Sequence, residues 1–86
     1  MEVNQLISLV KKKIEENIIT QNILIEDKTF FHANHLSHQK GKFHLKIIIK
    51  SIELKECTKI EANKKIYKIL ENEMKIYIHS LQISIN

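Results

Sequence analysis

Ile78-His79-Ser80-Leu81 opens the last alternating segment of the chain, and the way this segment joins the rest decides the fold. Across residues 77–85 apolar side chains recur at every second position, a spacing that predicts a β-strand. The predicted core-facing positions are Tyr77, His79, Leu81, Ile83 and Ile85. A histidine in register with leucine and isoleucine is either a satisfied residue at the edge of the core or part of a site, so its neighbours in space matter.

The segments before this strand predict a second strand and a helix. Phe43 to Lys50 alternates in the same way and predicts a strand with one face on the core. Thr58 and Glu61 match a capping box, which predicts a helix that begins at Thr58. We expect a short first turn near Thr58–Ala62 that runs or bends into a longer helix to about Lys75.

The N-terminal half adds one helix, one strand and a long connection. Apolar residues recur at helical spacing from Val3 to Asn17, which predicts an amphipathic helix that covers the core. Ile18 to Glu26 is rich in β-branched residues and predicts a strand. The connection from Asp27 to Lys42 contains the only glycine, Gly41, and is long for so small a domain, which is typical of functional loops. Ser51 to Lys55 is expected to turn the chain.

This order of elements predicts that the histidines meet. If the second and third strands share a sheet with the helix over one face, the right-handed crossover between them makes them parallel. Parallel strands begin at the same edge, so His44 and His79 should lie together there. The long connection leaves and returns at that edge, which leaves His32, His35 and His38 free to approach His79.

Simpler interpretations of these histidines stay open at this point. His44 lies on the polar side of its strand and could be solvated, and the loop histidines could be ordinary loop residues. Their number in one region favours metal binding. Their spacing matches no closed zinc motif, because the single Cys57 lies in another segment. We expect Cys57 to be a small packing residue.

Composition narrows the class of protein. Eighty-six residues predict a single domain over 1–86. No apolar run approaches the roughly 20 residues that span a bilayer, so no membrane association is expected. A single cysteine and the absence of a leader-like N-terminus favour the cytoplasm. The net charge is +4, and all fourteen basic residues are lysines. Without arginine the commonest specific contact to guanine is missing.

At this point the residues resemble the BolA family over nearly the whole chain. The histidine-bearing loop and the start of the second strand carry part of the likeness, and the final motif matches the family's valine/isoleucine-His-Ala-Leu with Ser80 in place of alanine. Leu54 stands where the family usually has phenylalanine. The stretches that match are Asp27, His32-Ala33-Asn34-His35, His44-Leu45-Lys46-Ile47, Ser51, Lys64-Lys65-Ile66-Tyr67, Leu70-Glu71-Asn72-Glu73-Met74 and Ile78-His79-Ser80-Leu81.

The resemblance implies an α+β fold of order α-β-β-α-α-β, like the second class of KH domains, with a three-stranded sheet and helices on one face. It implies a non-enzymatic adaptor, monomeric alone, that binds a monothiol glutaredoxin and shares a [2Fe–2S] cluster in cluster trafficking or iron sensing. His79 is the implied cluster ligand. The implied second ligand is one of His32, His35, His38 and His44. The partner would supply a cysteine and a glutathione thiolate, because the cluster needs four ligands.

The alternative that the family also implies is a nucleic-acid-binding transcriptional regulator. The basic charge agrees with it. The family's Arg-His-Arg triplet, however, reads Ala62-Asn63-Lys64 here, and a Gly-x-x-Gly clamp is missing. No nucleophile–base pair or phosphate loop argues for catalysis.

Overall fold

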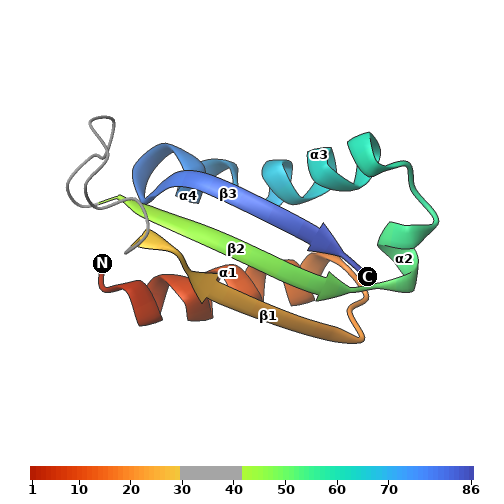
Figure 1. Cartoon of the computed structure of the whole chain (residues 1–86), viewed down its shortest axis with the longest axis horizontal. Helices are drawn as coiled ribbons and strands as arrows, with labels where there is room; N and C mark the ends of the chain where they lie inside the picture. Colours follow the sequence, from red (N-terminus) through yellow and green to blue (C-terminus); the bar gives the residue numbers. More distant parts are fainter. Residues whose placement is uncertain (30–41) are drawn as a thin grey trace.

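The computed structural model describes residues 1–29 and 42–86. In this part of the chain three strands form one sheet, with helical segments before the first strand and between the second and third (Figure 1). The elements are α1 (Val3–Asn17), β1 (Asn22–Asp27), β2 (Phe43–Lys50), α2 (Ile52–Lys55), α3 (Lys59–Ile69), α4 (Glu71–Ile76) and β3 (Ile78–Ile85).

The sheet has the order β1-β2-β3, with β1 antiparallel and β3 parallel to the central β2. The parallel pairing follows from the helical crossover, and it confirms the predicted topology. In Figure 1 the helices lie behind the sheet, and β2 and β3 begin at the same end of the domain. The chain therefore has the predicted α+β fold with helices on one face of a three-stranded sheet.

The core lies between this sheet and the helices. Alternate residues of β2 supply its centre, while α1 and α3 each contribute a stripe at helical spacing, as their amphipathic patterns require. Burial of these apolar side chains is the main source of stability. The side chains that are fully buried include Leu6, Val10, Ile14, Leu45, Ile47, Ile49, Leu54, Ala62, Ile66 and Leu70.

Two predicted elements have the predicted bounds, Val3–Asn17 for α1 and Phe43–Lys50 for β2. The N-terminus of α1 carries a capping box that the sequence analysis did not predict, with Glu2 as N-cap and Gln5 Oε1 accepting from the Glu2 N–H at 3.2 Å. The predicted capping box of Thr58 is confirmed at the start of α3. Local sequence patterns were sufficient to predict these bounds and this cap, because no tertiary contact overrides them.

The prediction that the first strand begins at Ile18 is wrong, since β1 begins at Asn22. The backbone N–H of Ile18 instead closes the last turn of α1, and its side chain is buried. The following residue is bound to the segment after β2: Ser51 donates to the Ile19 carbonyl at 2.7 Å, and Ile19 N–H donates to Glu53 at 3.1 Å. The backbone groups of Ile18 and Ile19 that make these hydrogen bonds are therefore not available to pair with β2.

The helical segments between β2 and β3 also differ from the prediction. The expected turn over 51–55 is the short helix α2, because the Ser51 hydroxyl caps it by accepting from Leu54 N–H at 3.2 Å. The expected bend near Thr58–Ala62 lies instead at Leu70, where φ and ψ of −97° and 16° separate α3 from α4. Neither glycine nor proline marks this bend in the sequence. The Leu70 side chain is fully buried there, so the bend lies against the core.

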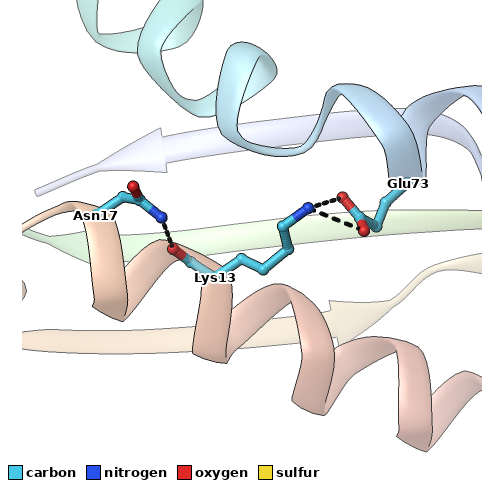
Figure 2. A network of polar contacts seen from close by, with 3 residues as sticks. All are labelled: Lys13, Asn17 and Glu73. Carbon is cyan, nitrogen blue, oxygen red and sulfur yellow. Dashed lines mark hydrogen bonds and ion pairs between the residues drawn. The ribbon is translucent and has the colours of Figure 1, made fainter.

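An ion pair joins the first helix to the last one. Lys13 Nζ on α1 lies 2.8 and 3.1 Å from the two carboxylate oxygens of Glu73 on α4, as Figure 2 shows. Asn17 Nδ2 donates to the Lys13 carbonyl at 2.7 Å and so binds the last turn of α1. The Glu73 side chain is 5% exposed and that of Lys13 is 32% exposed. A carboxylate this buried needs its partner, because an unpaired buried charge is costly.

Lys13→Met should therefore destabilise the fold by about 1–3 kcal/mol, since it leaves the Glu73 carboxylate buried without its cation. The double variant Lys13→Met/Glu73→Met should recover most of this loss, because it removes both charges and keeps the volume. Urea unfolding followed by circular dichroism measures both changes. A double variant as unstable as the single one would contradict this account.

Thr58→Ala should lower the free energy of unfolding by about 1 kcal/mol, because it removes a helix cap. Hydrogen bonds from the backbone and then the side chain of Thr58 hold the pKa of Glu61 below its usual value. The stabilisation from Glu61 is therefore present above its unfolded-state pKa and disappears as pH falls through the lower folded-state pKa. The difference between wild type and Thr58→Ala should shrink in acid, whereas Thr58→Ser should resemble wild type at every pH. A difference that is independent of pH would show that the Thr58 hydroxyl accepts from the Glu61 N–H without acting on the Glu61 carboxylate.

Candidate functional site

The starts of β2 and β3 are joined by an irregular pairing. Phe43 pairs with Ile78, but the next residue of β2, His44, pairs with Ser80, so that His79 is an extra residue in β3. Such a bulge changes the direction of the side chains that follow. This corrects the predicted alternation of Tyr77, His79 and Leu81, because Ile78 is buried in the core and begins the strand.

The backbone of His44 is held by the end of β1. Its N–H donates to the hydroxyl of Thr29 at 3.1 Å, and its carbonyl accepts from Lys28 N–H at 2.7 Å. Asp27 fixes Thr29 in turn, because one carboxylate oxygen accepts from both the N–H and the hydroxyl of Thr29. This aspartate-centred turn is a local motif that the Asp-x-Thr sequence favours. It holds the His44 backbone, at the start of β2, next to the residues that follow β1.

The ring of His44 lies between two residues of β3. Its Nδ1 is 2.6 Å from Ser80 Oγ, and its centroid is 4.9 Å from that of the His79 ring, at an interplanar angle of 60°. His44 is only 5% exposed, and both His79 and Ser80 are half-buried. The interpretation of His44 as a solvated surface residue is therefore wrong, and the half-buried ring of His79 lies beside it.

The structure thus brings together two of the five predicted site residues, His44 and His79. The other three, His32, His35 and His38, fall within residues 30–41 and lie outside the described residues. Sequence reasoning missed Ser80 as a member of the site. The signal that could have found it was the serine in a motif where the resembled family has alanine.

Two adjacent imidazoles offer nitrogen ligands for a soft or borderline metal such as zinc or iron. Across residues 1–29 and 42–86 no group of three or more histidine, cysteine or acidic side chains is arranged to hold a metal ion. His44 and His79 are the two potential nitrogen ligands that the described residues bring together here. Cys57 lies after α2, beyond the end of β2, whereas the histidine pair lies where β2 begins. Its thiol is 3.6 Å from the Glu53 carbonyl.

The surface of α3 has a different character. Four lysines on this helix are exposed and give its surface a positive charge. They are Lys59, Lys64, Lys65 and Lys68. Within the described ranges no helix has the length and apolar character that crossing a bilayer requires.

Comparison with known proteins agrees with this fold. The chain belongs to the class of small α+β domains with a three-stranded mixed sheet and helices. The family model described as BolA-like protein matches residues 14–86, and the chain therefore belongs to the BolA-like family.

A curated relative and several solved structures lie within the same family. The DNA-binding transcriptional regulator BolA of Haemophilus influenzae is 27% identical over 75 residues, covering 87% of this chain and 70% of that protein. The BolA domain of SufE1 from Arabidopsis thaliana superposes with a TM-score of 0.78 at 23% identity, covering 92% and 87% of the two chains. BolA1 from Arabidopsis thaliana gives 0.76 at 20% identity, covering 91% and 86%. At these identities the structures show the fold alone.

Proposed function

We propose that this chain is a BolA-like adaptor that shares a [2Fe–2S] cluster with a monothiol glutaredoxin, in cluster trafficking or iron sensing. The observation that carries the proposal is the pair of rings, His44 and His79, 4.9 Å apart where β2 and β3 begin. Neither residue sits beside the other in the sequence, and only the parallel pairing brings them together. The adaptor role needs no catalytic group of its own.

The donor set fits this cluster. Histidine can replace cysteine as a ligand of a [2Fe–2S] cluster, and two neutral imidazoles make the cluster less negative and raise its reduction potential. Two ligands from this chain leave two positions, which suit the cysteine of the glutaredoxin and a glutathione thiolate.

The two histidines differ in access. His79 is half-buried and can meet a partner from outside, whereas His44 is 5% exposed. Ligation through His44 therefore requires its surroundings to open when the partner binds. If His44 stays covered, the second ligand is His32, His35 or His38, and His44 only supports His79. Substitution distinguishes these two arrangements.

His79→Ala should abolish cluster sharing, because it removes the accessible ligand. Mixing the chain with a cluster-loaded monothiol glutaredoxin and recording visible absorption and circular dichroism measures this. His44→Ala should change the spectrum as strongly if His44 is a ligand. A spectrum that the wild-type chain leaves unchanged would exclude the adaptor function.

Two controls make the comparison specific. Cys57→Ser should share the cluster as wild type does, because the thiol lies apart from the histidine pair. Far-ultraviolet circular dichroism and urea unfolding of each variant separate loss of a ligand from loss of the fold. Loss of the cluster in Cys57→Ser would contradict the assigned site.

Transcriptional regulation through DNA binding is the second candidate function. Two observations favour it: the Haemophilus relative is named as a DNA-binding regulator, and α3 exposes four lysines. Lysine neutralises phosphate without reading sequence, so the expected binding is strongly dependent on salt.

The triple variant Lys64→Gln/Lys65→Gln/Lys68→Gln should reduce affinity for duplex DNA and flatten the plot of log affinity against log salt. The expected decrease in slope is about 0.9 for each DNA phosphate that a lysine no longer neutralises. Fluorescence anisotropy over a salt series measures it, and His79→Ala is the matched variant that should bind DNA as wild type does. Binding that depends on His79 but not on these lysines would contradict a role of α3 in DNA binding.

A further inference from the structure

We infer that Ser80 is a positioning residue, which holds the His44 ring in the tautomer that offers Nε2 to the shared cluster. The inference rests on the proposed function in the arrangement where His44 is the second ligand. It deepens that function, because it names the group that prepares the His44 ring. The observation that carries it is the 2.6 Å contact between His44 Nδ1 and Ser80 Oγ.

The contact is built by the bulge at His79. If β3 paired without its extra residue, the position after Ile78 would lie opposite His44, and Ser80 would be one step further along. The extra residue places Ser80 opposite His44 and leaves the ring of His79 beside that of His44, with centroids 4.9 Å apart. The bulge in β3 therefore brings the His44 ring next to both the Ser80 hydroxyl and the His79 ring.

The His44 ring cannot easily drift away from this hydroxyl. Its backbone N–H and carbonyl are bound to Thr29 and Lys28, at 3.1 and 2.7 Å. The ring is also buried, so that water is largely kept from competing for Nδ1. A hydrogen bond in this setting constrains both the orientation of the ring and the position of its proton.

The direction of that hydrogen bond decides what the ring can do. If Nδ1–H donates to Ser80 Oγ, the lone pair is on Nε2, and the neutral ring can bind a metal through that nitrogen. If Ser80 donates to Nδ1, the proton is on Nε2, and the ring must lose it before it can bind there. Histidines that bind metals usually donate their other N–H to an oxygen in this way, which fixes the tautomer. The inference therefore requires Ser80 to accept.

Nitrogen-15 NMR of the imidazoles in the free chain tests this without any cluster. Wild type should show His44 protonated on Nδ1 at a pH where the ring is neutral, and Ser80→Ala should lose this preference. Ser80→Thr should keep it, because it retains the hydroxyl. Ser84→Ala is the matched control, since Ser84 lies four residues further along β3 and pairs with Ile48. A wild-type ring protonated on Nε2, or a tautomer unchanged in Ser80→Ala, would overturn the inference.

The cluster-sharing assay supplies the second measurement. Ser80→Ala should weaken the complex with the cluster-loaded glutaredoxin by roughly 10- to 100-fold, the usual effect of removing a group that orients a metal-binding histidine. Ser80→Thr should restore it, and Ser84→Ala should match wild type. Undiminished sharing by Ser80→Ala would overturn the inference. If wild type itself shares no cluster, the proposed function fails, and the tautomer of His44 still decides whether Ser80 positions the ring.

Discussion

The parallel pairing of β2 with β3 is the constraint on which the rest of this structure depends. A parallel pair needs a crossover, which here consists of α2, α3 and α4, and these helices supply one side of the core. The same pairing makes both strands begin at one end of the domain (Figure 1). Both the packing of the core and the position of the candidate site therefore follow from the parallel pairing of β2 and β3.

Polar contacts reinforce this arrangement at both ends of the sheet. Where β2 ends, the buried hydroxyl of Ser51 caps α2 and donates to the Ile19 carbonyl. This side chain therefore connects the segment before β1 to the segment after β2. Where β2 begins, Thr29 and Ser80 bind the backbone and ring of His44. Across the helix layer, Lys13 and Glu73 connect α1 to α4 (Figure 2). Such groups contribute little net energy when paired, but leaving any of them buried alone is costly, and this favours one arrangement over others.

The features that were predicted correctly are set by local sequence patterns, and those that were predicted wrongly are set by contacts between distant segments. The stripe of α1, the alternation of β2 and the capping box of Thr58 are local patterns, and each element has the predicted character. The bend at Leu70, the late start of β1 and the bulge at His79 arise where distant segments compete for the same space or the same backbone groups. The convergence of His44 and His79 was predictable only through the topology, and the role of Ser80 was not, because a one-residue shift in register decides it.

By itself the sequence determined the class of the domain, the order of its strands and longer helices and the histidines that a site can use, because periodicity and caps act over a few residues and resemblance to a family covers nearly the whole chain. Only the tertiary structure decided which of those histidines touch. His44 is buried rather than solvated and lies against His79 and Ser80, since the parallel register and its bulge bring residues 36 positions apart to 2.6 Å. Side-chain contacts of that kind depend on the register of two strands, which no local pattern in the chain specifies.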